Sequence, residues 1–186
     1  MQQPNSAETT ALLEVFRICL INSIMDKQQI IARADKQIEQ EAEPPYYIIE
    51  LALSGSKNIN DTISILHNLV GEDKPQMSGR AVLGYLYQHY TANNLSLRQV
   101  ANTIYWLGVH CEFSEEERYF MHSIDSEYDL AADGYGYGSI EEAKKQIIRF
   151  TALYEAFKLE NAHQWPEIDK AIPESAQAFY QKFKYQ

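Results

Sequence analysis

Residues 96–111, SLRQVANTIYWLGVHC, contain the pattern that decides the fold class. Ser96 and Gln99 have the spacing of a capping box at the start of a helix, and large apolar side chains follow at helical intervals. The same cap spacing recurs elsewhere in the chain. Three further pairs have it: Asp26 with Gln29, Ser114 with Glu117, and Ser139 with Glu142.

Apolar residues recur at helical spacing along the rest of the chain, and no segment alternates polar and apolar residues as a half-buried strand does. Glycines at 55 and 71 are expected to close helices as left-handed caps, and Pro173 is expected to break the C-terminal segment. Pro45 fits the first turn of a helix. The expected helices cover about residues 7–23, 26–43, 45–53, 60–70, 79–91, 96–111, 114 onward and 139–161. The sequence therefore predicts an all-α fold, a compact bundle of about eight or nine helices with no sheet.

The length of 186 residues is that of one domain, so we expect a single helical domain over residues 1–186. A chain of this size buries enough apolar surface to fold without a metal or disulfide. The two cysteines, Cys19 and Cys111, form no disulfide framework and no metal motif. Cys19 lies in an apolar run and is expected to be buried.

The formal net charge is −10, from 26 acidic and 16 basic residues. A nucleic-acid-binding surface needs clustered Lys and Arg, and so does docking on an anionic membrane. The composition therefore argues against direct nucleic-acid or membrane partners. The N-terminus lacks the pattern of a signal peptide, and no apolar run is long enough to span a membrane. The expected location is the cytoplasm.

Most of the excess negative charge lies in residues 112–133. Eight acids and a single base, Arg118, give this segment a net charge of −7. A solvated helix face would account for this, and so would a docking surface for a basic protein partner. The acids expected to contact such a partner are Glu112, Glu116, Asp125, Glu127, Asp129 and Asp133.

A glycine-rich segment, DGYGYGS at residues 133–139, follows these acids. It matches neither dinucleotide-binding nor P-loop spacing, and no strand precedes it. We expect a loop that presents Tyr135 and Tyr137, either to the partner or to the protein's own core. The chain has thirteen tyrosines, whose amphipathic rings are suited to interfaces.

No catalytic, cofactor-binding or metal-binding residues are predicted with a recognisable motif. The sequence has no nucleophile elbow, and His110 beside Cys111 is only a pair of sequence neighbours. An alternative is a metal-dependent enzyme with a His, Glu and Asp site within residues 110–129, around His110, Glu112 and His122. Its helices lack the HExxH and paired Glu-x-x-His spacings.

Two segments, IARAD at residues 31–35 and EPPYYIIELALS at residues 43–54, resemble the immunity proteins of bacterial contact-dependent growth inhibition systems. This resemblance implies tight binding of one cognate toxin, commonly a basic nuclease, in the cytoplasm. It implies no catalytic residues.

The leading expectation is an immunity or inhibitor protein that binds and neutralises a basic bacterial toxin. The acidic segment and the Tyr135–Tyr137 loop are its expected contact surface. Besides the metal-dependent enzyme, a helical adaptor that self-associates through its apolar tail stays open. The tail residues concerned are Phe179, Tyr180 and Phe183.

Overall fold

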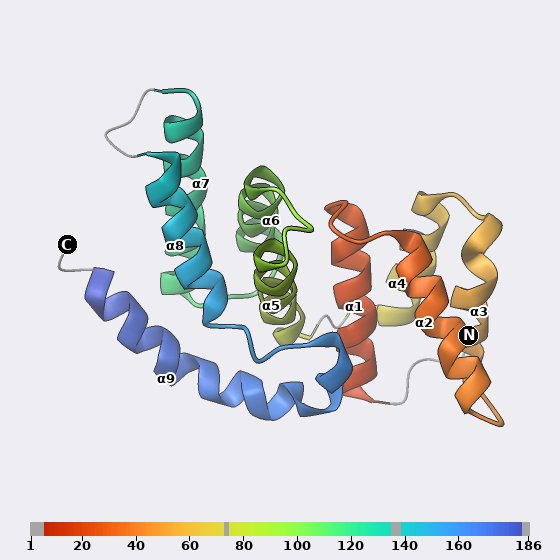
Figure 1. Cartoon of the computed structure of the whole chain (residues 1–186). Helices are drawn as coiled ribbons and strands as arrows, with labels where there is room; N and C mark the ends of the chain where they lie inside the picture. The colour runs from red at the N-terminus through yellow and green to blue at the C-terminus, as the bar shows by residue number, and fades with distance from the viewer. Residues whose placement is uncertain (1–5, 73–74, 135–138, 184–186) are drawn as a thin grey trace. The chain divides into compact units, whose positions relative to one another are not determined.

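The computed structural model describes residues 6–72, 75–134 and 139–183 (Figure 1). Within these ranges the chain forms nine α-helices, two short 3₁₀-helices and no strand, so the prediction of an all-α fold is confirmed. The α-helices are α1 (Ala7–Ile21), α2 (Lys27–Gln40), α3 (Tyr46–Ala52), α4 (Ile59–Val70), α5 (Met77–Thr91), α6 (Leu97–His110), α7 (Glu115–Ala132), α8 (Ile140–Ala152) and α9 (Trp165–Phe183). The 3₁₀-helices are η1 (Leu53–Ser56) and η2 (Leu159–Gln164).

The helices form two compact units, Met1–Ser78 and Gly79–Gln186. We call these unit 1 and unit 2. A single domain over residues 1–186 stays a prediction. None of the described helices combines the length and the apolar character needed to cross a bilayer.

Side-chain caps begin most of the helices where the sequence predicts them. The capping boxes at Asp26, Ser96 and Ser114 are all formed. The Ser139 hydroxyl accepts from the Glu142 N–H at 3.2 Å, but the Glu142 carboxylate accepts from Lys145 Nζ instead of completing a box. Local hydrogen bonds within three residues therefore set these starts.

In unit 1, α1 packs along α4 and α2 packs along α3 (Figure 1). Cys19 on α1 is fully buried, as predicted. The Lys27 ammonium group donates to three backbone carbonyls at the end of η1, those of Ser54, Gly55 and Lys57. This cation satisfies carbonyls that the end of a helix leaves unpaired.

Three predictions about this unit's helix ends have different outcomes. Gly71 has a φ of 75° and closes α4 as predicted. Gly55 is not a left-handed cap: it lies within η1, and its φ is not positive. Lys27 holds that end of the helix instead. Pro45 is the N-cap residue of α3, with extended ψ, and does not belong to the first turn.

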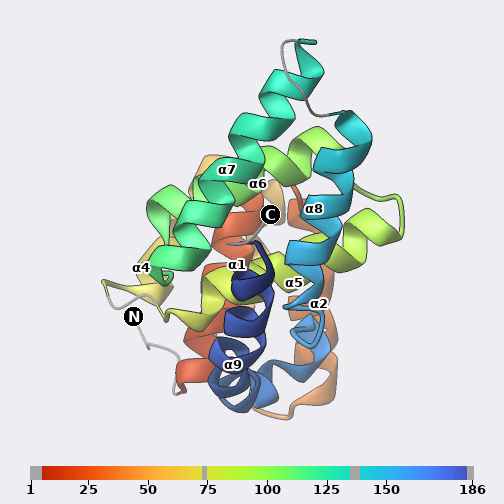
Figure 2. The same cartoon turned by 90° about the vertical axis from the view of Figure 1, so that its left-hand side faces the viewer.

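In unit 2, α7 packs against both α6 and α8, and the three helices are seen in Figures 1 and 2. Helix α5 approaches the segment that follows α8 very closely. A Cβ added at Gly84 would lie 2.4 Å from the Tyr154 carbonyl oxygen and 2.7 Å from that of Phe157. Only a glycine therefore allows this contact, which brings Tyr154 against α5.

Helix α8 is shorter than predicted because the chain turns after Ala152, not near residue 161. Bonds between residues three apart replace the helical pattern there, including that from the Tyr154 N–H to the Thr151 carbonyl. The turn buries Tyr154 and Phe157 almost completely. Burial of two large rings outweighs the local preference to continue the helix.

The predicted break at Pro173 is also wrong, since α9 continues through this residue. Proline removes one helical hydrogen bond, but its ring is on the exposed side here. The buried side chains of α9 lie on both sides of Pro173 at helical spacing, at Trp165, Ile172, Ala176 and Tyr180. This apolar stripe holds the helix together across the proline.

We expect Gly84→Ala to lower the free energy of unfolding by about 1–3 kcal/mol, because two backbone segments must move apart. Urea denaturation followed by circular dichroism measures this. Gly55→Ala is the matched control, since its added Cβ would meet only Ile31 Cδ1, at 3.8 Å. Equal effects of the two substitutions would contradict the close contact at Gly84.

Candidate functional site

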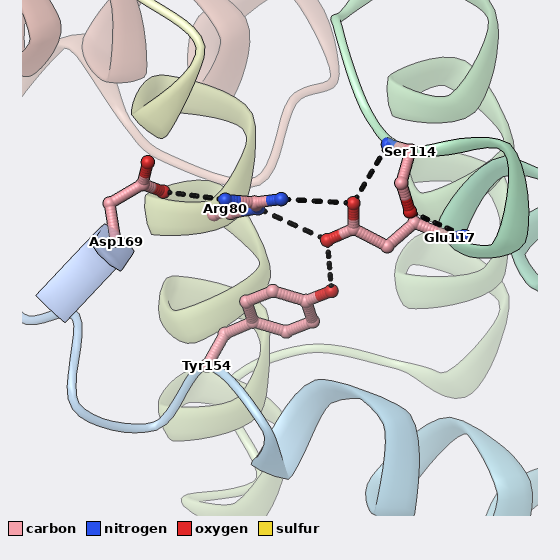
Figure 3. Close-up of polar contacts among 5 residues, drawn as sticks. All are labelled: Arg80, Ser114, Glu117, Tyr154 and Asp169. Carbon is pink, nitrogen blue, oxygen red and sulfur yellow. Dashed lines mark hydrogen bonds and ion pairs between the residues drawn. The ribbon is translucent and has the colours of Figure 1, made fainter. Parts of the chain in front are cut away.

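A buried ion-pair network joins four segments of unit 2 (Figure 3). Arg80 of α5 is 6% exposed and faces Glu117 of α7, which is 1% exposed. Arg80 Nε donates to Glu117 Oε1 and Nη2 donates to Oε2, both at 3.0 Å. Nη1 donates to Asp169 Oδ1 of α9 at 3.0 Å. The guanidinium group therefore ties α5 to both α7 and α9.

Each oxygen of the Glu117 carboxylate accepts a second hydrogen bond. The Tyr154 hydroxyl donates to Oε1 at 2.7 Å, and the Ser114 N–H donates to Oε2 at 2.8 Å (Figure 3). A carboxylate has about four acceptor sites, so all of them are used. Glu117 is thus both the capping-box residue of α7 and the centre of the buried network.

Burial opposes the ionisation of Glu117, but the hydrogen bonds from Arg80 and Ser114 outweigh it and lower the pKa of this carboxyl. Burial likewise opposes the charge of Arg80, yet hydrogen bonds and charge attraction from Glu117 and Asp169 raise the pKa of the guanidinium. Glu117 and Arg80 are therefore both charged at neutral pH. With two carboxylates and one guanidinium, the network has a net charge of −1.

We expect Glu117→Gln to lower the free energy of unfolding of unit 2 by about 3–5 kcal/mol, because it leaves Arg80 buried with only half-exposed Asp169 as its partner. Glutamine still has an oxygen to accept from Ser114, so the helix cap is kept. Glu115→Gln, at an exposed position in the same first turn, is the control and should change stability by less than about 0.5 kcal/mol.

The same pair of proteins gives a pH test. Because the folded-state pKa of Glu117 lies below its ordinary value of 4.5, its contribution is complete above that value and is lost as the pH falls below it. The stability difference between the native protein and Glu117→Gln should therefore shrink on acidification from pH 5 to pH 3, and an unchanged difference would contradict it.

A cavity of about 380 Å³ lies beside this network, between the start of α7 and the C-terminal half of α9. Its lining includes Arg80 and Glu117, the exposed carboxylate of Glu116, and Tyr180. Tyr180 is 8% exposed, and within the described part of the chain its hydroxyl has no hydrogen-bond partner. Unit 2 therefore has a hollow whose lining includes buried charges.

The structure divides the predicted contact acids between two sides of α7. Glu116 and Asp125 are nine residues apart, which is about two and a half turns, so they point in opposite directions. Asp125 and Asp129 lie on the same side of α7 as His122. Glu127 lies about three turns from Glu116 and therefore shares the side of Glu116. The acidic segment therefore does not form one continuous face.

The remaining predicted contact residues lie outside α7 or at its end. Glu112 is exposed in the connection from α6, and Asp133 is the exposed C-cap residue. Tyr135 and Tyr137 lie outside the described residues. Among the described side chains, none of the predicted contact acids forms an ion pair.

Exposed aromatic side chains lie on α7 and beside it. The Tyr105 ring of α6 meets the His122 ring edge-on, with centroids 5.5 Å apart. Tyr105 is 45% exposed, and Tyr119, one turn before His122, is 79% exposed. Large exposed rings next to carboxylates are typical of protein interfaces.

Burial and the neighbouring charge of Asp129 raise the pKa of Asp125, and the charge of His122 offsets part of this. Ionised Asp125 therefore disfavours the folded state. This penalty is complete above the raised pKa and absent below the ordinary value of 3.8.

Asp125→Asn should accordingly stabilise the protein at pH 7, by less than about 1 kcal/mol because water screens the charge. Thermal melts at pH 7 and pH 3 measure the gain, which should be lost at the lower pH. Glu127→Gln removes an acid from the other side of α7 and should leave the melting temperature unchanged. A loss of stability in Asp125→Asn would show that this carboxylate supports the fold.

The histidines of the alternative metal site pack against aromatic rings, and two residues of the apolar tail pack inside unit 2. His110 packs against Trp106, with ring centroids 4.5 Å apart, while His122 packs against Tyr105. Across the described ranges, no three His, Cys, Asp or Glu side chains gather as a metal site. Phe179 and Tyr180 of the apolar tail pack against Phe120 inside unit 2.

The buried network is the feature that sequence reasoning missed. The sequence patterns place Glu117 only in the acidic segment, and they do not identify Arg80, Tyr154 or Asp169. One signal was available: Arg80 is the only charged residue in an otherwise apolar stretch, GRAVLGYL at residues 79–86. An arginine in an apolar helix needs a buried acidic partner.

No protein family, curated protein or solved structure matches the chain.

Proposed function

We propose that this protein is an immunity or inhibitor protein that binds and neutralises a cognate basic bacterial toxin of the nuclease type. The observation that carries the proposal is that the acids of residues 112–133 other than Glu117 lack an ion-pair partner among the described side chains. Glu117 is neutralised internally, whereas the other seven acids of residues 112–133 form no ion pair with a described side chain. Six of these seven are exposed, and Asp125 is half-buried.

The energetics of Asp125 support the same proposal. A half-buried carboxylate next to a second carboxylate destabilises the folded protein. Residues that lower stability without a compensating contact are typical of functional surfaces. A cationic partner would supply the missing counter-charge, and the surrounding negative field would speed its approach.

The resemblance of residues 31–35 and 43–54 to growth-inhibition immunity proteins gives the partner its class. A nuclease toxin is basic because it binds phosphates, and acids on an inhibitor occupy the same surface. This partner chemistry agrees with the net charge of −10.

The proposal is tested by capture and rescue. The chain is used as bait in a lysate of the source organism, bound proteins are eluted with salt, and each is expressed alone in a susceptible host. We expect a basic protein that stops growth, and we expect co-expression of the chain to restore growth. If no captured protein is toxic, or if the chain restores growth against none, the immunity function is wrong.

The contact surface is tested by reversing three acids together, in Glu116→Lys, Asp125→Lys and Asp129→Lys. We expect the association rate with the captured toxin to fall at least about tenfold at low salt and the difference to shrink at high salt, because long-range attraction is lost. Stopped-flow mixing measures the rate.

The matched control reverses three exposed acids of unit 1, in Glu39→Lys, Glu41→Lys and Glu43→Lys. The two triple variants change the net charge equally. If both slow association to the same extent, total charge drives the encounter and the α7 acids are not its contact surface.

A further inference from the structure

The cavity beside the Arg80–Glu117 network combines a hollow with buried charge. Its volume of about 380 Å³ is within the range of sites that hold small molecules or single side chains. Arg80 and Glu117 line one part of it and are almost completely buried. Exposed polar side chains, Ser114, Glu116, Gln177 and Gln181, line the rest with Pro173, Ala176 and Tyr180.

The charge around this cavity is unbalanced. The charge of Arg80 is paired with Glu117 and Asp169, and the two carboxylates leave the network with one excess negative charge. Glu116 adds a second negative charge on the lining and is in no ion pair with a described residue. Among the described lining residues, Arg80 is the only cation. A guest of positive charge is therefore favoured over a neutral or anionic one.

The Tyr180 hydroxyl is a second and independent indication of a ligand. It is removed from water and lacks a hydrogen-bond partner among the described residues, although buried hydroxyl groups nearly always have one. The neighbouring Tyr154 hydroxyl interacts with it, but the proton of that hydroxyl is directed at Glu117, so the Tyr180 oxygen receives no donor from Tyr154. Burial, together with the charges of Glu117 and Glu116, raises the pKa of Tyr180 against the opposing effects of the Tyr154 hydroxyl and Arg80. A group with several N–H donors would satisfy this oxygen.

We propose that the cavity binds the cationic end of one arginine or lysine side chain of the basic partner. The Glu116 carboxylate and the Tyr180 hydroxyl accept its N–H groups, and the exposed amides of Gln177 and Gln181 move aside to admit it. This inference rests on the proposed function for the identity of the partner. The cavity, its charge and the unpaired hydroxyl stand independently of that function.

The test uses capped amino acids as probes, so it needs no toxin. N-acetyl-arginine amide and N-acetyl-lysine amide are titrated into the full chain, with neutral N-acetyl-glutamine amide as the control ligand, and amide NMR shifts are followed. We expect saturable shifts at residues 114–117 and 176–181 for the two cations and none for glutamine amide. Shifts scattered over the acidic surface, or equal shifts with glutamine amide, would overturn the proposal.

Three variants make the assignment specific. Glu116→Gln should weaken binding of the cationic probes about twofold to fivefold, as expected for an exposed charge pair. Tyr180→Phe should weaken it while leaving the fold intact or more stable, because the hydroxyl that it removes has no partner in the described ranges. Glu127 lies on the same side of α7 as Glu116 but outside the cavity lining, so Glu127→Gln should bind the cationic probes as the native protein does. If neither Glu116→Gln nor Tyr180→Phe weakens binding, the proposed recognition groups are wrong.

Failure of this inference is distinguishable from failure of the immunity function. If the chain neutralises a captured toxin and Glu116→Gln and Tyr180→Phe bind that toxin unchanged, the partner does not use the cavity. If the probes bind as expected but no toxin is neutralised, the cavity is a site for a free organic cation, and the partner's side chain is not its ligand.

Discussion

The carboxylate of Glu117 is the point on which the structure of unit 2 depends. It accepts four hydrogen bonds, from two nitrogens of Arg80, the Tyr154 hydroxyl and the Ser114 N–H. A buried carboxylate is stable only when its charge is paired and its acceptors are filled. The positions of α5, the start of α7 and the turn after α8 must therefore be compatible with this one group. Gly84 meets the same requirement, since its missing side chain lets Tyr154 come close to α5.

The network also changes how the acidic segment is understood. One acid of that segment is a structural group in the interior, and the helix that contains it turns the others to different sides. Glu116 is directed to the cavity beside α9, whereas Asp125 and Asp129 share the side of His122, whose ring meets that of Tyr105. A partner that contacts α7 therefore meets two chemically different surfaces: a hollow next to buried charge, and an aromatic patch with carboxylates.

The segment that resembles immunity proteins has a partly structural explanation in unit 1. Ile48, Leu51 and Ser54 are buried in the packing of α3 and η1, and Lys27 donates to the carbonyls that follow. Core packing accounts for these positions without any partner. Tyr46 and Leu53 differ, because they are 56% and 70% exposed. Packing within the unit does not explain why large apolar residues stand at these two positions.

The sequence by itself determined the helices and where most of them begin, because capping boxes and apolar periodicity arise from residues within a few positions of one another. It also determined the excess of negative charge and its place in the chain. Only the tertiary structure decided the end of α8, the continuity of α9 through Pro173, and the inward direction of Glu117. The partners of Glu117 at Arg80 and Tyr154 are each 37 residues away, and Arg80 and Asp169 are 89 apart. Contacts at such separations form only when the packed helices bring them together, so no local pattern reveals them.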